Sequence, residues 1–294
     1  MDCDRQAGRI DLHIHSTASD GTYSPLQLLD MALAEGLRAI SITDHDSIEG
    51  TKQIDPGRVP EGLLFLTGVE ISAAPPPGYP LSGSLHILGY GFDPGDPALS
   101  RPLQQLQAAR SDRNPQILQR LQRIGIDLRR EDIAAAAPGG QLGRPHIARA
   151  LVQKGHARSI DDAFDRFLGS GKPAYVDKYR IPAEEAVAAL RAAGGVAVLA
   201  HPFLIEGLDE AGLLRLAADL KALGLQGIEV YYPGHSSAQV KSGLSMAARF
   251  GLLVTGGTDF HGDLTPEIQL GRGAGDLFVP FCVYEALVAA LPAR

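Results

Sequence analysis

Short apolar runs alternate along this chain with longer segments of helical spacing. The first run begins at Ile10 and the second covers residues 39–43. Between them, residues 26–33 place three leucines on one helical face, and Ser24-Pro25 has the residue types of a helix cap and first helical position. The pattern predicts a strand, a helix and a second strand in the first part of the chain.

The same alternation returns in the second half. Apolar runs follow segments of helical spacing there; the runs are 196–200, 227–231 and 252–255, and the helical segments are 182–193, 208–223 and 237–250. Residues 63–67 and 69–72 are also strand-like, and a proline-rich loop, 75–80, leads to a strand that contains His86. Repeated strand-then-helix order predicts an α/β fold with a parallel barrel or a doubly wound sheet.

The middle of the chain has a different pattern, because helical spacing continues there without a convincing strand. The predicted helices cover 99–124, 131–137, 145–154 and 159–168. We therefore predict a core domain formed by residues 1–96 and 172–294. Residues 97–171 are predicted to form a small helical insertion that covers the substrate side of this core.

Composition narrows the possible environments and partners. With 294 residues and 45% hydrophobic content, the chain can form one large α/β barrel or two ordinary domains. No window approaches twenty continuous apolar residues, and the first residues lack signal-peptide features, so we expect no membrane association. Two cysteines cannot make a disulfide framework, which favours a reducing, cytoplasmic location. A net charge of −7 argues against duplex nucleic acid and is compatible with small anionic substrates.

Histidines and acidic residues gather at the predicted strand ends. His13 and His15 are two residues apart, so strand alternation places both rings on one face. An isolated histidine beside an apolar run is usually a core residue with one hydrogen bond. Here, however, six of the nine histidines occupy such positions and acidic residues join them; the set is His13, His15, His45, Glu70, His86, His201, Asp259 and His261. Ligands from so many strand ends predict a shared metal site at the mouth of an irregular barrel.

Six short segments, in this order and spacing, resemble the PHP (polymerase and histidinol phosphatase) family and, within it, the TrpH-like branch. They are Asp11-Leu12-His13-Ile14-His15-Ser16, Thr43-Asp44-His45, Gly68-Val69-Glu70, His86, Ala200-His201-Pro202 and Asp259-Phe260-His261. The resemblance covers nearly the whole chain and implies a distorted (β/α)7 barrel with a centre of two or three metals. It implies that His13, His15, Glu70 and Asp259 bind one cation, that Glu70, His86 and His201 bind the second, and that Asp20, His45 and His261 bind the third. Some members have histidine where this chain has Asp20.

Mixed nitrogen and oxygen ligands suit Mn²⁺ best, with Fe²⁺ or Zn²⁺ as alternatives. Two cations about 3.5–4 Å apart can hold a bridging hydroxide for attack on a phosphoryl group. The sequence contains no recognisable triad or elbow with a Ser or Cys nucleophile, so we expect no phosphorylated enzyme. His201, His235 and Asp46 are the candidate proton donors to the leaving oxygen, and the sequence does not rank them.

Residues outside the metal set are candidates for substrate binding: Arg144, His146, Lys172 and His235. Arg144 lies between Gly143 and Pro145 at a predicted helix start, where backbone N–H groups and a guanidinium can hold a second phosphate. TrpH-like members are similar to phosphatases of nucleoside 3′,5′-bisphosphates and to exonucleases acting on 5′-phosphorylated oligonucleotides. We therefore expect a metal-dependent phosphoesterase that hydrolyses a phosphate monoester of a small nucleotide, first of all a nucleoside 3′,5′-bisphosphate.

Several alternatives to this function stay open at the level of sequence. A 5′-3′ exonuclease on short 5′-phosphorylated oligonucleotides and a histidinol-phosphate-type phosphatase would use the same chemistry. A degenerate metal-binding domain is disfavoured by the complete ligand set. An amide or lactone hydrolase is disfavoured because the basic accessory residues fit phosphate better.

Overall fold

The computed structural model describes residues 7–79, 81, 85–136 and 142–292. In this part of the chain one sheet has eight strands: β1 (Arg9–Ile14), β2 (Leu37–Ile42), β3 (Leu64–Ala74), β4 (Leu85–Tyr90), β5 (Ile181–Pro182), β6 (Val196–Leu199), β7 (Gly227–Tyr231) and β8 (Leu253–Gly256). Helices alternate with them: α1 (Pro25–Ala34), α2 (Glu49–Lys52), α3 (Pro97–Arg123), α4 (Arg130–Ala136), α5 (Arg144–Gln153), α6 (Ile160–Ala163), α7 (Ala183–Ala192), α8 (Glu210–Ala222), α9 (Ser237–Phe250) and α10 (Phe281–Ala289). Four shorter turns of helix complete the set: η2 (Pro56–Arg58), η3 (Phe164–Leu168), η4 (Pro202–Leu204) and η5 (Gly262–Leu264).

The predicted α/β class is confirmed, but the sheet is mixed rather than parallel throughout. Its order is β1-β2-β3-β4-β6-β7-β8, and β5 pairs with β3. β4 runs antiparallel to both β3 and β6, whereas the other pairs are parallel. The described part of the connection between β3 and β4 contains no helix, and a chain that returns directly to its neighbour pairs with it antiparallel.

The two ends of this strand order meet at the backbone. Ile14 at the end of β1 forms a parallel bridge with Phe260, beyond β8. Asp259 N–H donates to the His13 carbonyl at 2.8 Å, and His15 N–H donates to the Phe260 carbonyl at 2.9 Å. A Cβ atom on Gly257 would lie 2.3 Å from the His13 nitrogen, so only glycine allows this approach. The contact brings the first and last predicted ligands of the chain together.

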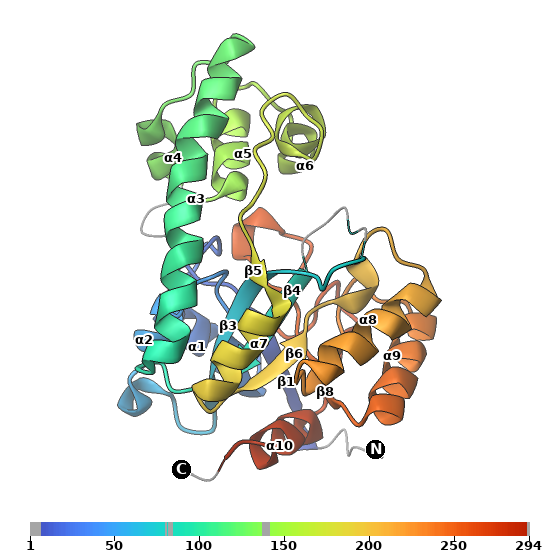
Figure 1. Cartoon of the computed structure of the whole chain (residues 1–294). Helices are drawn as coiled ribbons and strands as arrows, with labels where there is room; N and C mark the ends of the chain where they lie inside the picture. Colours follow the sequence, from blue (N-terminus) through green and yellow to red (C-terminus); the bar gives the residue numbers. More distant parts are fainter. Residues whose placement is uncertain (1–6, 80, 82–84, 137–141, 293–294) are drawn as a thin grey trace.

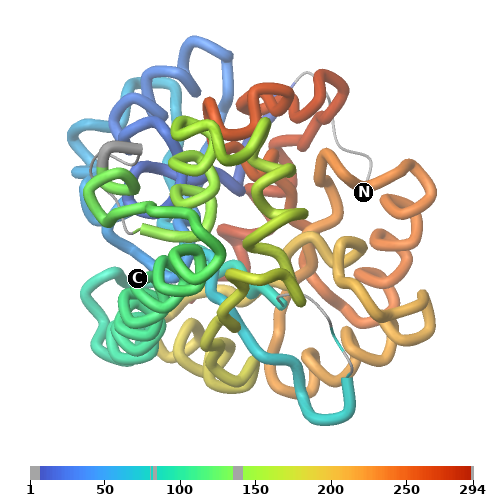
Figure 2. Tube along the Cα trace, turned by 90° about the horizontal axis from the view of Figure 1, so that it is seen from above, coloured from blue at the N-terminus to red at the C-terminus, as the bar shows by residue number. Residues whose placement is uncertain are grey.

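α3 runs beside the sheet and extends beyond one end of it, where α4, α5 and α6 lie, and α10 lies at the opposite end near both termini (Figure 1). Seen from above, the yellow-green part of this segment lies over the centre of the molecule, with the other elements around it (Figure 2). The segment has its own buried cluster, which includes Ile117, Leu121, Ile147, Leu151 and Leu168. Helices occur at the four places expected between residues 97 and 171, while the division into domains stays a prediction.

Two features near the C-terminus were not expected from the sequence. No helix was expected at residues 281–289, where α10 packs its Val283 and Leu287 into the core. Cys282 is disulfide-bonded, a pairing that the sequence did not predict; Cys3 lies outside the described residues. Among the described residues, no helix has both the length and the apolar character needed to cross a bilayer.

The close approach at Gly257 gives a testable prediction for the fold. Gly257→Ala should lower the free energy of unfolding by about 1–3 kcal/mol, because the added methyl group overlaps the backbone of β1. Gly57→Ala is the control, since its Cβ would meet only Asp55 Oδ1 at 3.4 Å. Denaturant unfolding of both metal-free variants measures the difference. Equal stability of the two variants would contradict the proposed backbone contact.

Candidate metal centre

Glu70 of β3 is the centre of the histidine cluster. Its carboxylate is 1% exposed. Oxygen to nitrogen distances of 2.8–3.5 Å connect it to five imidazoles, those of His45, His86, His201, His15 and His13. The backbone holds it in place, because the Glu70 N–H donates to the Asp44 carbonyl and the Asp46 N–H donates to the Glu70 carbonyl. One carboxylate is therefore in contact with residues from four strand ends.

The potential ligands form three overlapping groups. In each group, one ligand atom per residue lies within 4.8 Å of the others; the groups are His13, His15, Glu70 and Asp259; His45, Glu70 and His86; and His15, Asp20, His45 and His261. The first group is the set implied for the first cation. His201 belongs to none of the three, but its Nε2 is 3.1 Å from Glu70 Oε1 and 3.3 Å from His86 Nδ1.

The donor atoms of these residues fit a metal centre. Buried side-chain atoms without a hydrogen-bond partner cost free energy unless something else binds them. Such atoms concentrate here: His13 Nε2, His15 Nε2, Asp20 Oδ1, His45 Nδ1, Glu70 Oε2, His86 Nε2, His201 Nδ1 and Asp259 Oδ1. Imidazole nitrogens and carboxylate oxygens in one small volume are ligands for two or three divalent transition-metal ions.

The electrostatics of the cluster agree with a site for cations. Burial alone would raise the pKa of Glu70, but His86, His45 and His13 hold it well below its ordinary value. Burial alone would lower the pKa of His15, yet Asp259 and Glu70 raise it to about 10. The carboxylates thus remain ionised and favour the protonated, positively charged form of the imidazoles. Bound cations would supply the same positive charge beside the carboxylates.

Three residues at the site have a backbone conformation that residues other than glycine rarely adopt. Asp46, His201 and Asp259 have φ angles of 54°, 24° and 55°, and all other described residues with positive φ are glycines. Each follows a strand and belongs to the predicted site. Such strain costs about 1–3 kcal/mol per residue and persists where the surroundings fix the conformation. Here it directs the end of each strand towards the cluster.

Asp46 has partners that suit a permanently ionised carboxylate. It accepts hydrogen bonds from the N–H and hydroxyl groups of Ser72 and forms an ion pair with Arg110. Burial alone would raise its pKa, but Lys178 and Arg110 hold it below its ordinary value. An ionised carboxylate accepts hydrogen bonds and pairs with cations, and the role of Asp46 as a proton donor to the leaving oxygen stays a prediction.

Four cationic residues lie beside the cluster, and we call them the basic group: Arg110, Arg113, Arg144 and Lys178. Burial, followed by Arg144 and Arg110, lowers the pKa of Arg113 to about 10, so the guanidinium groups are close to one another. Nε and Nη1 of Arg113 are buried without a hydrogen-bond partner. Two carboxylates act on these four cations: Asp46 is in contact with Arg110 and lies 3.8 Å from Lys178, and Asp177 acts electrostatically on Arg144. Positive charge therefore exceeds negative charge here.

The sequence analysis gave no role to Arg110 and Arg113, although a signal for them was present. In α3 the buried positions are Leu99, Pro102, Leu103, Leu106, Arg110, Arg113, Ile117 and Leu121. The two arginines thus continue an apolar stripe with helical spacing, where a charged side chain requires a reason.

The four predicted substrate residues have different surroundings. Arg144 is half-buried, donates to the Leu168 carbonyl and faces the rings of Phe164 and Tyr175. His146 is buried, and burial lowers its pKa although Asp20 acts in the opposite direction, so its ring lies within electrostatic reach of the third ligand group. The structure does not bring Lys172 to the cluster through any described contact, and the residue is exposed.

His235 packs against Tyr232, a residue that contacts a predicted metal ligand. Its Nδ1–H donates to the Val230 carbonyl, and its ring packs 5.1 Å from that of Tyr232 and 5.0 Å from that of Phe203. Tyr232 in turn donates to Asp259 Oδ2 at 3.0 Å. Tyr232, rather than His235, therefore makes the direct contact with a predicted ligand.

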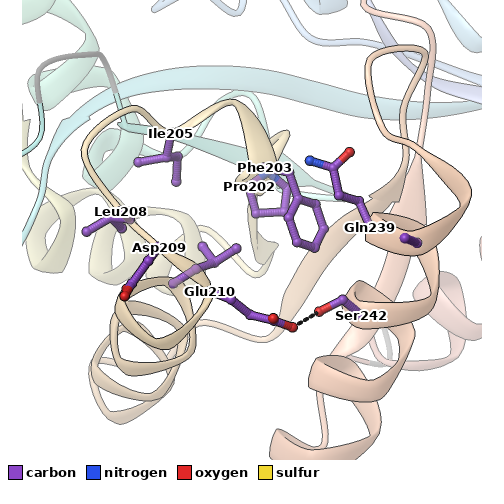
Figure 3. Close-up of a pocket in the computed structure, with 10 residues that line it drawn as sticks. Pro202, Phe203, Ile205, Leu208, Asp209, Glu210, Gln239 and Ser242 are labelled. Carbon is purple, nitrogen blue, oxygen red and sulfur yellow. Dashed lines mark hydrogen bonds between the residues drawn. The ribbon is translucent and has the colours of Figure 1, made fainter.

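A separate cavity begins directly after His201. Figure 3 shows its lining, in which Pro202, Phe203 and Ile205 face residues of α8 and α9, and Glu210 accepts a hydrogen bond from Ser242. The cavity has a volume of about 340 Å³ and contains none of the predicted ligands. It is therefore distinct from the histidine cluster.

Known proteins resemble this chain over most of its length. A 5′-3′ exoribonuclease of Haemophilus influenzae is 36% identical over 253 residues, covering 86% of this chain and 90% of that protein. A 3′,5′-nucleoside bisphosphate phosphatase of Chromobacterium violaceum is 34% identical over 260 residues, covering 86% and 87%. A solved structure from Bifidobacterium adolescentis, described as a candidate metal-dependent phosphoesterase, has a TM-score of 0.83 at 31% identity and covers 95% of each chain.

The family model described as the PHP domain matches residues 11–168, which is more than half of the chain and includes the first five predicted ligands and His86. The relatives confirm the predicted family and the predicted class of enzyme, a metal-dependent phosphoesterase. From the family match and from relatives above 30% identity, we conclude that the chain belongs to the PHP domain family.

Proposed function

We propose that this protein is a metal-dependent phosphatase that removes a phosphate monoester from a small nucleotide, most simply a nucleoside 3′,5′-bisphosphate. The observation that carries the proposal is the position of the basic group beside the Glu70 cluster. A substrate with two phosphates needs one site for the reacting phosphate and a second cationic site for the other. The relative from C. violaceum is named for this substrate class.

The three ligand groups, together with the contacts of His201 with Glu70 and His86, support the ligand sets that the family resemblance implies. We assign His13, His15, Glu70 and Asp259 to the first cation and Glu70, His86 and His201 to the second. Asp20, His45 and His261 belong to the third, and His15 lies close enough to the same group to join it. Mn²⁺ remains our choice because carboxylates contribute to every set. Bound divalent cations would screen the charge of the reacting phosphate and make a water molecule more acidic.

The residues of the basic group would have different roles in binding the substrate. Arg113 and Arg144 would hold the second phosphate, since Arg113 has two unpartnered N–H groups and Arg144 lies at the first turn of α5. Arg110 and Lys178 are already in contact with Asp46, which fixes them between the second phosphate and the cluster. His201 and His235 remain the candidate proton donors to the leaving oxygen.

The proposed function also fits a barrel with an inserted helical domain. We propose that β1, β2, β3, β4, β6, β7 and β8 close into a distorted (β/α)7 barrel, with the bridge between Ile14 and Phe260 at the closure. Residues 97–171 would form an inserted helical domain that covers the active site. This arrangement would explain why two residues of that segment reach the site: Arg110 pairs with Asp46, and His146 lies within electrostatic reach of Asp20 and His261.

A second candidate function is exonuclease activity on short 5′-phosphorylated oligonucleotides. The relative from H. influenzae is a 5′-3′ exoribonuclease, and its identity to this chain is as high as that of the phosphatase. The basic group would then bind the 5′-phosphate or the phosphodiester next to the cleaved bond. Comparing turnover of a 5′-phosphorylated trinucleotide and of a nucleoside 3′,5′-bisphosphate separates the two candidates.

The ligand assignment predicts the effect of removing Glu70. Mn²⁺ at a hundred times its dissociation constant should stabilise the wild type by about 2.7 kcal/mol, because only the folded state binds it. Glu70→Ala should bind at least one cation fewer and gain much less stability. Metal analysis and thermal unfolding with and without Mn²⁺ measure both effects. Glu61→Ala, at an exposed position, is the control. A Glu70→Ala protein with the full metal content would exclude Glu70 as the shared ligand.

The assignment of Arg144 predicts a change in substrate preference. Arg144→Ala should reduce kcat/KM for a nucleoside 3′,5′-bisphosphate about ten- to a hundredfold more than for the matching 5′-monophosphate. The reason is that a charge-assisted contact to the non-reacting phosphate contributes about 1.5–3 kcal/mol. Steady-state kinetics on both substrates give the ratio.

Arg158→Ala provides the matched control for this experiment, because the Arg158 side chain is 90% exposed in the same helical segment. It should leave both kcat/KM values near those of the wild type. An equal loss on both substrates in Arg144→Ala would mean that Arg144 acts on the reacting phosphate or on the fold.

A further inference from the structure

Glu229 in β7 is a buried carboxylate that connects two predicted metal ligands. It is 0% exposed. Its Oε1 lies 2.9 Å from His13 Nδ1, and its Oε2 accepts a hydrogen bond from the backbone N–H of His201 at 2.7 Å. The two contacts use both oxygens, one for each of two strand ends that are far apart in the chain.

The contact with His13 determines which ring nitrogen faces the cluster. A neutral imidazole has one N–H group, and a carboxylate beside Nδ1 accepts the hydrogen bond that places it there. The lone pair is then on Nε2, which is buried without a hydrogen-bond partner. This atom lies 3.3 Å from Asp259 Oδ1 and 3.5 Å from Glu70 Oε2. The tautomer fixed by Glu229 is therefore the one that can bind a cation in the first group.

The contact with His201 supports a strained turn. His201 has φ 24° and ψ 60°, directly after β6, and Pro202 begins η4 as the next residue. Its backbone N–H points to Glu229, and its ring Nε2 reaches Glu70 Oε1 at 3.1 Å. Without the carboxylate, this N–H would be buried and unpaired, which would favour a different turn and a different ring position.

The other buried carboxylates near the cluster have different partners. Asp11 accepts from Thr258 and from the backbone of Gly271, and Asp44 accepts from Ser16 and Ser19. These contacts connect loops to β1 and β2. Glu229 differs from Asp11 and Asp44, because it forms a hydrogen bond with an imidazole nitrogen of a predicted ligand. Like them, it belongs to none of the three ligand groups.

We propose that Glu229 is a positioning residue that sets the affinity of the first cation site and couples it to the second through the His201 turn. The proposal rests on the metal centre described under the proposed function, but not on the substrate. Carboxylates that accept a hydrogen bond from a metal-binding histidine typically change metal affinity about 10–100-fold when they are replaced.

Glu229→Gln tests the proposal with almost no change of shape. A glutamine has one acceptor oxygen and a donor-only nitrogen, so it can satisfy His13 Nδ1–H or His201 N–H but not both. We expect Mn²⁺ to bind about 10–100-fold more weakly to the variant, measured by competition with a chelator of known affinity. Glu229→Ala should bind Mn²⁺ more weakly still.

Thr51→Val is the matched control for the loss of a buried polar group. The Thr51 hydroxyl is buried and bonds the backbones of Ile42 and Gly68 without contact to a histidine. This variant should lower the Tm of the metal-free protein but leave Mn²⁺ affinity within about threefold of the wild type. Glu229→Gln with wild-type Mn²⁺ affinity and a lowered Tm would show that Glu229 serves the fold alone and would overturn the proposal.

A measurement on the wild type covers the case in which Glu229 variants do not fold. In protein loaded with Zn²⁺ and labelled with ¹⁵N-histidine, long-range NMR correlations should show His13 protonated at Nδ1. Protonation at Nε2 instead would overturn the proposal. None of these readouts depends on turnover, so a wild type that binds Mn²⁺ tightly but hydrolyses no nucleotide would refute the proposed function and leave the role of Glu229 intact.

Discussion

The contact between the Glu70 carboxylate and five imidazoles is the interaction on which the rest of the site depends. Those rings come from β1, from the turns after β2 and β6, and from β4, so each strand must end at the correct height for the carboxylate to reach them. A single buried charge in contact with several elements fixes their relative positions more strictly than apolar packing does, since burying it unpaired is costly. The strained residues Asp46, His201 and Asp259 reflect this requirement.

The residues of the histidine cluster can be picked out from the sequence because their signal is local. A histidine or acid directly after an apolar run is visible without knowledge of the fold, and nearly all of the predicted ligands meet in the structure. The antiparallel β4 was not predicted, because strand direction depends on how the chain returns from the end of β3 to the start of β4. Lys172 stays a prediction, since a cationic residue in a glycine-rich loop carries no information about which way it points.

Residues that act from outside the ligand groups were harder to find. Glu229 lies alone in an apolar strand, and no spacing rule connects it to His13, 216 residues away. Arg110 and Arg113 lie on the buried stripe of a helix outside the sheet, so their relation to the cluster depends on how α3 packs on it. These positions carry a visible anomaly, a charge where an apolar residue is expected, but only three-dimensional proximity gives the anomaly its meaning.

The bridge between Ile14 and Phe260 also determines when the site can form during synthesis. Asp259 reaches its place only by donating its N–H to the His13 carbonyl, so ligands from the first and last parts of the chain depend on each other. Contacts between residues so far apart close late, because the entropy of the large intervening loop must be overcome first. A chain still emerging from the ribosome therefore contains most of the histidines before it contains the last carboxylate, and its cation site matures only once nearly the whole sequence has folded.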